Sequence, residues 1–447
     1  MKSDRPAVTL VGSGLAGALM AIYLGRRGYR VRVFERRPDL RQADTAGGRS
    51  INLALSARGL AALEGVGLEE RILSLAIPMR GRMMHGQGGR LTYQPYSKDP
   101  TQSIKSVSRG GLNNELLSAA EATPGVILHF SERCLDVDLD ASAVTFLNET
   151  TGKEHEEKAD FVIGADGAFS AVRARLQKSD RFDYEQSYLA HGYKELTIPA
   201  APGGGHRMEK HALHIWPRGS FMMIALANLD GSFTCTLFWP FSGPNSFEAL
   251  ETDEQLLTFF EKTFPDALPL LPDLARDYRS NPTGSLVTIR CGPWYHGGRV
   301  VLLGDAAHAV VPFYGQGMNA AFEDCIVLDR CLEQAGHDLA RAFSSFYAAR
   351  KDNADALADL AIENFLEMRD RVASRRFLLR KRVERTLHRL FPRAFVPVYS
   401  LVSFSLTPYA EARARGRAQE RILRGLLIGT VALAVLLPLL VLFLLLR

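Results

Sequence analysis

The sequence has few of the features that mark disulfide-rich or metal-binding proteins. Its five cysteines are odd in number and none lies in a C-x-x-C pair, which argues against a disulfide scaffold or zinc cluster and fits a reducing compartment. It contains no H-E-x-x-H motif and no His/Asp/Glu facial triad, so we predict no metal site. Internal repeats and low-complexity linkers are also missing. No removable signal segment is expected before the first apolar strand, which starts at Ala7.

Composition and charge distinguish the body of the protein from its C-terminal region. Apolar residues make up 47% of the sequence and charged residues 23%, as in soluble globular proteins, and 447 residues suggest two or three structural units. The formal net charge is +5, yet residues 367–424 alone hold fifteen Lys or Arg against five Asp or Glu. The rest of the chain is therefore mildly acidic, which argues against a nucleic-acid-binding body.

The last part of the sequence is a long apolar run. Residues 425–446 carry no charge, and 22 residues at about 1.5 Å each would span roughly 33 Å as a helix, enough for a bilayer core of about 30 Å. Arginines are frequent just before the run and only one follows it, a pattern typical of a cytoplasmic flank. A buried core helix is the alternative. We expect a C-terminal transmembrane anchor, with the body of the protein facing the cytoplasm and the identity of the membrane left open.

The N-terminal region predicts a nucleotide-binding βαβ unit. A buried strand at 7–11 leads into Gly12-Ser13-Gly14-Leu15-Ala16-Gly17, then a helix, then a second strand that ends at Glu35. Gly12 permits a tight turn, Gly14 lets the backbone approach a pyrophosphate, and Gly17 lets the helix pack closely on the strand. Glu35 is placed to accept hydrogen bonds from ribose hydroxyls. An acid there disfavours a 2′-phosphate, so the sequence favours FAD or NAD over NADP as the bound dinucleotide.

Two later segments distinguish between these dinucleotides. Residues 159–167 form a predicted strand ending in an Asp-Gly turn, and residues 299–308 form another that ends in Gly-Asp before a helix of small residues. Together with the N-terminal glycine motif, they resemble the three-motif signature of the flavin-dependent aromatic hydroxylases, which are single-component FAD monooxygenases. The resemblance implies that Asp305, Asp166 and Arg109 serve FAD, with Asp166 also at the transient NADPH encounter.

The same resemblance gives a role to the glycine-rich loop at 311–319. Glycines before a helix can pack against a flat ring and offer amide hydrogens to its carbonyl edge, and in the resembling family this loop lies beside the flavin ring. The resemblance therefore places Gly317, Met318 and Asn319 near the pyrimidine end of the flavin.

Four further stretches narrow the resemblance to the kynurenine 3-monooxygenase family, over essentially the whole chain. They are residues 48–56, residues 78–85 with 94–96, residues 233–241, and residues 364–370 with 397–399. The resemblance implies that NADPH and O2 are consumed and that a flavin C4a-hydroperoxide hydroxylates L-kynurenine to 3-hydroxy-L-kynurenine. Family positions assign the amino-acid head of the substrate to Arg82, Tyr96 and Tyr399, where a guanidinium and phenol donors suit a carboxylate. They assign a further polar contact to Asn364, and apolar walls around the aryl ring to Phe238, Phe313 and Met368.

Other interpretations stay open at this point. The substrate amino group already activates the ring, so we assign no catalytic base and expect structural roles for His85 and His308. A second hypothesis is an FAD-dependent hydroxylase or epoxidase of a membrane-soluble quinone precursor or isoprenoid. A third is a membrane-tethered flavin-binding scaffold without catalysis. The oligomeric state is not predicted.

The expected fold is α/β. A Rossmann-like FAD-binding domain takes residues 1–75, 103–180 and 290–365, and a sheet-rich substrate domain takes 76–102 and 181–289. Residues 366–424 alternate apolar and basic side chains at helical spacing and predict an amphipathic helical cap near the membrane. The transmembrane anchor at 425–446 completes the prediction.

Overall fold

A computed structural model describes residues 6–42, 52–97, 99, 101–367, 383, 386–387, 389–391 and 394–446; within the last range, the side chains of 426–435 and 437–444 are not described. Its first layer is a six-stranded sheet with the order β18-β19-β12-β1-β2-β8, parallel except for the β18–β19 pair. The strands are β1 (Ala7–Val11), β2 (Arg30–Glu35), β8 (Val126–Phe130), β12 (Phe161–Gly164), β18 (Tyr295–His296) and β19 (Val300–Leu302). The predicted βαβ unit is thus present, with α1 (Leu15–Arg26) between β1 and β2.

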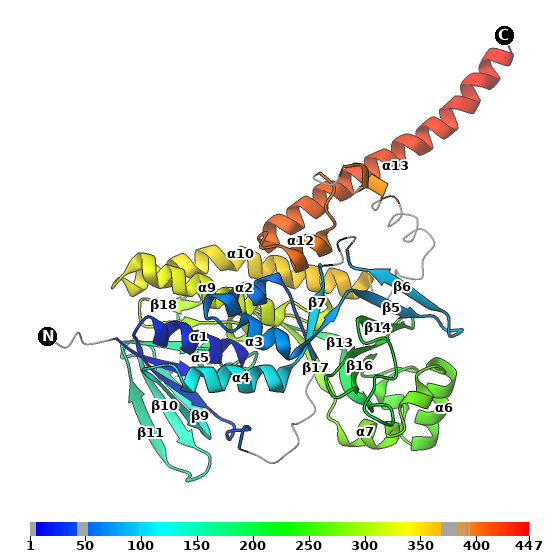
Figure 1. Cartoon of the computed structure of the whole chain (residues 1–447). Helices are drawn as coiled ribbons and strands as arrows, with labels where there is room; N and C mark the ends of the chain where they lie inside the picture. The colour runs from blue at the N-terminus through cyan, green and yellow to red at the C-terminus, as the bar shows by residue number, and fades with distance from the viewer. Residues whose placement is uncertain are drawn as a thin grey trace.

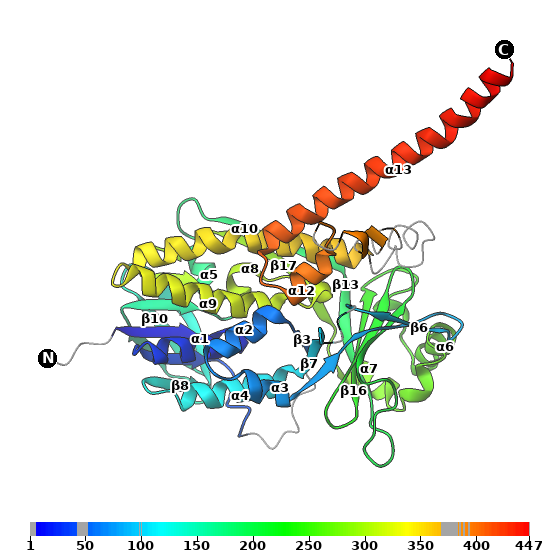
Figure 2. The ribbon, with the colours of Figure 1, turned by 45° about the horizontal axis from the view of Figure 1, so that its top comes forward.

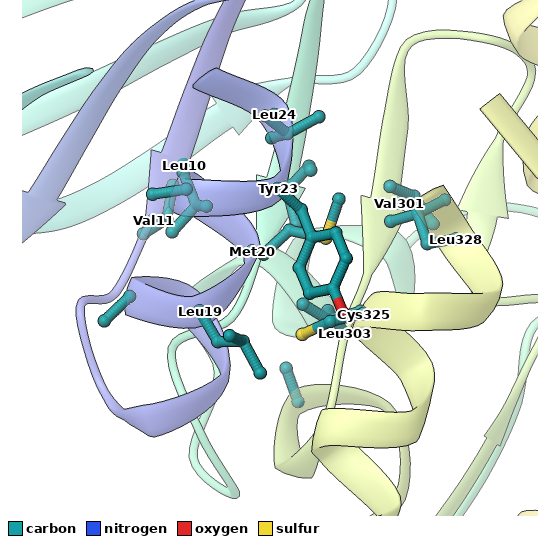
Figure 3. Packing of buried hydrophobic residues seen from close by; sticks show 14 of the residues in the cluster. Leu10, Val11, Leu19, Met20, Tyr23, Leu24, Val301, Leu303, Cys325 and Leu328 are labelled. Carbon is teal, nitrogen blue, oxygen red and sulfur yellow. The ribbon is translucent and has the colours of Figure 1, made fainter. Parts of the chain in front are cut away.

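Helices cover this sheet and bury its apolar side chains. Figure 3 shows Leu19, Met20 and Tyr23 of α1 against β19 and helix α9 (Gly317–Ala335). The central strands are apolar at nearly every position, as expected for parallel strands covered on both faces. The other helices of this region are α2 (Ala57–Gly65), α3 (Glu69–Ser74), α4 (Arg109–Glu121), α5 (Ala171–Leu176), α8 (Asp305–His308) and α10 (Leu339–Leu366). Figure 1 shows α10 lying along α9 on one side of the molecule.

A small antiparallel sheet extends the first layer. It has the order β11-β10-β9 and consists of β9 (Glu132–Asp138), β10 (Ala143–Asn148) and β11 (Glu154–Lys158). Phe146 of β10 stacks on Phe34 of β2 with ring centroids 4.2 Å apart, so this sheet shares the core of the nucleotide-binding layer.

The second body of the protein is a seven-stranded sheet with the order β17-β13-β16-β15-β14-β5-β6. The strands are β5 (Gly81–His85), β6 (Leu91–Pro95), β13 (Asp183–Ile198), β14 (Ala212–Pro217), β15 (Met222–Ala227), β16 (Phe233–Pro240) and β17 (Gly284–Gly292). One face packs on α6 (Asp253–Thr263) and α7 (Leu274–Ser280) around a buried aromatic core that includes Trp216, Trp239 and Phe264. Short 3₁₀ turns lie at Phe247–Ala249 and Leu268–Leu270.

A three-stranded sheet, β3-β7-β4, lies where the chain passes between the two bodies. It consists of β3 (Asn52–Leu55), β4 (Ala76–Met79) and β7 (Ile104–Ser108). The side-chain amide of Asn52 donates to the carbonyl of Ala227 at 3.1 Å, which ties this sheet to β15. The three-stranded sheet is therefore joined to the seven-stranded sheet by a direct hydrogen bond.

The C-terminal region corrects one prediction. It contains α12 (Val398–Phe404) and a long α13 (Tyr409–Leu445), whose far end projects away from the body in both Figure 1 and Figure 2. Within the part of the chain that is described, no helix has the length and apolar character needed to cross a membrane. The described side chains of α13 lie mainly in residues 409–425, where arginines are frequent, and most of the expected span lies outside the described side chains. The predicted transmembrane helix at 425–446, and the cytoplasm-facing membrane location derived from it, are therefore wrong on this finding.

Buried charges tie the helices that follow β19. Asp324 of α9 is fully buried and accepts a hydrogen bond from Arg350 Nε of α10 at 2.6 Å. His308 Nε2 of α8 lies 2.6 Å from the other carboxylate oxygen, which also accepts the backbone N–H of Gly304 at 3.2 Å. Burial favours the neutral acid, but the charges of His308 and Arg350 hold the pKa of Asp324 below its usual range.

We predict that Asp324→Asn lowers the free energy of unfolding by about 3 kcal/mol, because it removes one of the two carboxylates paired with buried Arg350 and the acid that holds His308. The matched control is Asp273→Asn, which removes an exposed ion pair with Arg276 and should cost less than about 1 kcal/mol. Because the folded-state pKa of Asp324 is lowered, its contribution is complete above the unfolded-state pKa of about 3.9 and declines as the pH falls below it. Urea unfolding of both variants at several pH values measures this. Equal losses for the two variants would contradict the assignment.

Candidate active site

The turn after β1 forms a cradle at the start of α1. Gly12 has φ +95°, and a Cβ added to it would lie 2.6 Å from the carbonyl oxygen of Ala165, so β1 and β12 approach closely there. A Cβ on Gly17 would lie 2.0 Å from the carbonyl oxygen of Gly12, which confirms that a side chain is excluded where helix and turn meet. In contrast, a Cβ on Gly14 would meet nothing within 4 Å. Gly14 is also the N-cap of α1 and offers no side-chain cap, so the first amide groups of the helix face open space suited to an anion.

Glu35 lies at the end of β2 beside this turn. Its Oε2 accepts the backbone N–H of Ser13 at 2.9 Å, and its Oε1 accepts Nε of Arg37 at 2.8 Å. Burial would raise the pKa of Glu35, but Arg37 and the backbone donors outweigh it and hold the pKa below its usual value. Glu35 is thus an ionised acceptor at the position that the sequence predicts.

Asp166 lies at the turn after β12, next to Gly12. Its Oδ2 accepts the backbone N–H groups of Ala171 and Val172 at 2.7 and 3.3 Å, which fastens the turn to α5. Its Oδ1 is buried without a hydrogen-bond partner among the described residues, and burial raises the pKa of the carboxyl above its usual range. An unpartnered buried acceptor beside a glycine cradle is a group that a bound ligand can satisfy.

Asp305 follows β19 and begins α8. Gly304 before it has φ +61°, a left-handed value that suits glycine. Asp305 is exposed. Desolvation by the surrounding protein nevertheless raises the pKa of its carboxyl, and the charges of His308 and Arg109 oppose that rise. Arg109, exposed at the start of α4, therefore acts on Asp305 from another part of the chain.

The loop that follows carries the remaining predicted cofactor contacts. A 3₁₀ turn at Pro312–Tyr314 leads through Gly315, with φ +66°, to the start of α9 at Gly317. Met318 is half-buried. The Asn319 side chain is fully buried and used within the protein, since it donates to the carbonyls of Ala54 and Gly315 and accepts from Ser56 N at 2.9 Å.

Arg82 of β5 lies against a pair of stacked phenol rings. Its guanidinium carbon is 5.5 Å from the Tyr96 ring centroid and 4.8 Å from that of Tyr399, and these two rings stack at 5.2 Å. Burial raises the pKa of Tyr96 and of Tyr399, so both phenols stay neutral and can donate hydrogen bonds. Within the described chain, Arg82 Nε is buried without a hydrogen-bond partner. Tyr96 and Tyr399, which are far apart in the sequence, thus both lie against the Arg82 cation.

An aromatic wall adjoins this cation. Phe238 and Phe313 lie 4.9 Å apart, and Phe365 of α10 packs on Phe313 at 4.3 Å. Leu213 and Ile224 pack both on this wall and on the cluster that holds Tyr96 and Tyr399, so the two parts form one continuous surface. The Asn364 side chain donates to the carbonyl of Phe313 at 2.6 Å and positions that loop. Met368 lies outside the described residues.

Comparisons with known proteins identify the family to which this chain belongs. Residues 5–359 match the family model described as FAD binding domain. A kynurenine 3-monooxygenase from Myxococcus xanthus is 54% identical over 95% of this chain and 91% of its own length, and one from Dictyostelium discoideum is 48% identical over 94% of this chain and 93% of its own. The chain belongs to the kynurenine 3-monooxygenase family.

Solved structures agree on the fold. The tetrameric form of 2-methyl-3-hydroxypyridine-5-carboxylic acid oxygenase superposes with a TM-score of 0.68 at 20% identity, over 83% of this chain and 95% of that one. PqsL from Pseudomonas aeruginosa superposes with a TM-score of 0.65 at 22% identity, over 82% and 98%. At these identities the likeness establishes the fold alone.

The residues present fit the FAD that the family binds. Gly14 leaves room for a pyrophosphate at the amide end of α1, and Glu35 is an ionised acceptor at the end of β2. The buried Asp166 Oδ1 has no hydrogen-bond partner among the described residues, so a bound cofactor could supply one. Sequence reasoning found these groups because each follows a strand within a short motif.

Sequence reasoning gave no role to several residues that pack beside the predicted substrate-binding side chains. Tyr314 stacks on Tyr399 at 5.9 Å and belongs to the same apolar cluster as Phe313. Leu213 of β14 and Ile224 of β15 carry no motif; only the alternation of the strands marks them. His85 and His308, expected to be structural, are each held by an acid, Asp266 and Asp324 respectively, at 2.6 Å.

We predict that Gly14→Ala folds normally but weakens FAD binding at least about tenfold, because the added methyl occupies space that only the cofactor would fill. Gly88→Ala, in the β5–β6 hairpin with equally open surroundings, is the control and should bind FAD like the wild type. Flavin fluorescence titration of the apo-proteins measures the affinity, and their thermal unfolding checks the fold. Unchanged affinity in Gly14→Ala would place the pyrophosphate elsewhere.

Proposed function

We propose that this protein hydroxylates L-kynurenine to 3-hydroxy-L-kynurenine, with FAD as cofactor and NADPH and O2 as co-substrates. One observation carries the proposal: the guanidinium of Arg82 lies against the neutral phenols Tyr96 and Tyr399, and Leu213 and Ile224 connect this group to the aromatic wall of Phe238 and Phe313. A substrate that fits both parts combines an anionic head with a flat aryl group. L-Kynurenine has this combination.

The head of the substrate would bind at Arg82. A guanidinium can donate two parallel hydrogen bonds to a carboxylate, and the two phenols can add donors from the sides. Leaving the buried Arg82 Nε unpaired is costly, so an arriving carboxylate gains both charge neutralisation and a satisfied donor. The site therefore selects for an anion.

The aryl ring would lie along Phe238 and Phe313, with the hydrogen bond from Asn364 to the Phe313 carbonyl holding that wall in place. Family positions add Met368. The redox chemistry, which is reduction of the flavin by NADPH and activation of oxygen, would be supplied by the bound cofactor. The chain's own contribution is to orient the ring and exclude water, since the buried aromatic wall leaves little room for solvent.

On the cofactor side, we propose that Gly12, Gly14 and Gly17 admit the pyrophosphate and that Glu35 contacts the ribose. Arg109, Asp166 and Asp305 would contact the remaining polar parts of FAD. Gly317, Met318 and Asn319 would lie beside the flavin ring. The division into a FAD-binding domain at 1–75, 103–180 and 290–365 and a substrate domain at 76–102 and 181–289 also stays a proposal; the six-stranded and seven-stranded sheets support it.

A quinone precursor or isoprenoid suits the site less well. Either would place an uncharged group against Arg82 and remove it from water without giving it a partner, which is unfavourable by several kcal/mol.

The proposal is tested by NADPH oxidation of the FAD-loaded protein with and without L-kynurenine, with the product identified by mass. We expect stimulation and one added oxygen on the aryl ring. Absence of both would reject the proposal, and stimulation by a quinone precursor instead would favour the other substrate class.

We predict that Arg82→Ala raises the KM for L-kynurenine about 10- to 100-fold while FAD stays bound, because a charge-assisted pair to the carboxylate is lost. Arg82→Lys should recover part of the loss, since it keeps the charge but not the planar fork. Arg90→Ala, at an exposed arginine of the same hairpin, is the control and should leave KM unchanged. Steady-state kinetics measures the KM, and flavin absorbance measures the bound FAD. Loss of FAD from Arg82→Ala would contradict the assignment.

A further inference from the structure

A buried hydrogen bond joins the first residue of α13 to the loop before α9. The hydroxyl of Tyr409 donates to Gln316 Oε1 at 3.0 Å. Tyr409 is fully buried and Gln316 is 2% exposed, so neither group can turn to water instead. The contact joins the C-terminal helices to the loop that precedes Gly317.

Arg58 of α2 holds Tyr409 from the other side. Its guanidinium carbon lies 4.0 Å from the Tyr409 ring centroid, its Nη1 pairs with Glu323 of α9 at 2.5 Å, and its Nη2 donates to the carbonyl of Thr407. A cation stacked on a ring in a desolvated site contributes up to about 2 kcal/mol. Arg58 therefore fixes where the Tyr409 ring lies, and α2, α9 and α13 meet at this side chain.

The contact continues from Gln316 to the end of β3. Gln316 Nε2 donates to Ser56 Oγ at 3.3 Å, and the backbone N–H of Ser56 donates to Asn319 Oδ1 at 2.9 Å. Asn319 in turn donates to the carbonyl of Gly315. The two residues that flank Gly317 and Met318 are thus both held by side-chain hydrogen bonds, and one of these bonds comes from the C-terminal region.

We propose that Tyr409 is a positioning residue for the loop 312–319: docking of α13 through Tyr409 sets the conformation of Gln316 and, through it, the loop that faces the flavin ring. The effect on catalysis rests on the proposed function, whereas the effect of Tyr409 on the loop conformation does not. A loosely held loop would let water reach the flavin and misplace the aryl ring against Phe313. Oxygen consumption would then yield more hydrogen peroxide and less hydroxylated product.

Tyr409→Phe tests this, because it removes the hydroxyl and keeps the ring beneath Arg58. We expect amide hydrogen exchange of peptides covering 312–319 to speed up about fivefold, as for the loss of one buried hydrogen bond, in protein with and without FAD. In the FAD-loaded enzyme we expect the fraction of NADPH oxidation that ends as peroxide to rise at least about twofold, with little change in the KM for L-kynurenine.

Tyr23→Phe is the matched control. The Tyr23 hydroxyl is also buried and also contacts α2, donating to the Ala62 carbonyl at 2.8 Å, but it does not touch the loop. We expect Tyr23→Phe to lower thermal stability without changing loop exchange or the peroxide fraction. Gln316→Met removes the other end of the bond, and adding Tyr409→Phe to it should have little further effect, because both changes break the same contact.

Unchanged exchange of 312–319 in Tyr409→Phe would overturn the proposal, as would equal peroxide release from Tyr23→Phe or additive effects with Gln316→Met. If the wild-type protein does not oxidise NADPH in response to L-kynurenine, the proposed function fails, whereas the exchange comparison still decides whether Tyr409 holds the loop.

Discussion

Two consecutive acids on α9, Glu323 and Asp324, organise the buried charges on which the site depends. Asp324 joins α8 and α10 through His308 and Arg350, and the same Arg350 reaches Glu323 at 2.6 Å. Glu323 also holds Arg58, which lies against Tyr409 at the start of α13. Charges this deeply buried are tolerable only when each has its partner, so the helices cannot shift independently. The loop before Gly317 is therefore held between helices whose relative positions these ion pairs fix.

The predicted substrate site is assembled from segments that are far apart in the sequence. β5 supplies Arg82, β6 leads to Tyr96, and α12 supplies Tyr399, while the aromatic wall comes from β16 and the loop after α8. The polar and apolar parts share Leu213 and Ile224, so they present one surface of two chemical characters. Such a surface suits an amphiphilic aromatic amino acid better than a uniformly apolar ring, because the cation would otherwise be desolvated without compensation.

The sequence predicted best what lies within one short segment. Gly12, Gly17 and Glu35 follow from one βαβ unit, and the structure places them at a single turn. The grouping of Arg82 with Tyr96 and Tyr399 came from family resemblance, because no local pattern relates residues in separate elements. Tyr409 and Gln316 gave no signal, since their contact depends on how α13 docks. The membrane span predicted at 425–446 was wrong: a charge-free run indicates only an apolar segment, and among the described residues no helix qualifies to cross a bilayer.

The central claim is that an enclosed guanidinium and an adjoining aromatic wall together bind L-kynurenine. The most direct measurement is a crystal structure of the FAD-loaded protein soaked or co-crystallised with L-kynurenine. The account predicts the substrate carboxylate within about 3 Å of the Arg82 guanidinium nitrogens, beside the stacked Tyr96 and Tyr399 rings, with its aryl ring against Phe238 and Phe313. A ligand whose carboxylate points away from Arg82, or whose ring lies outside this wall, would contradict it.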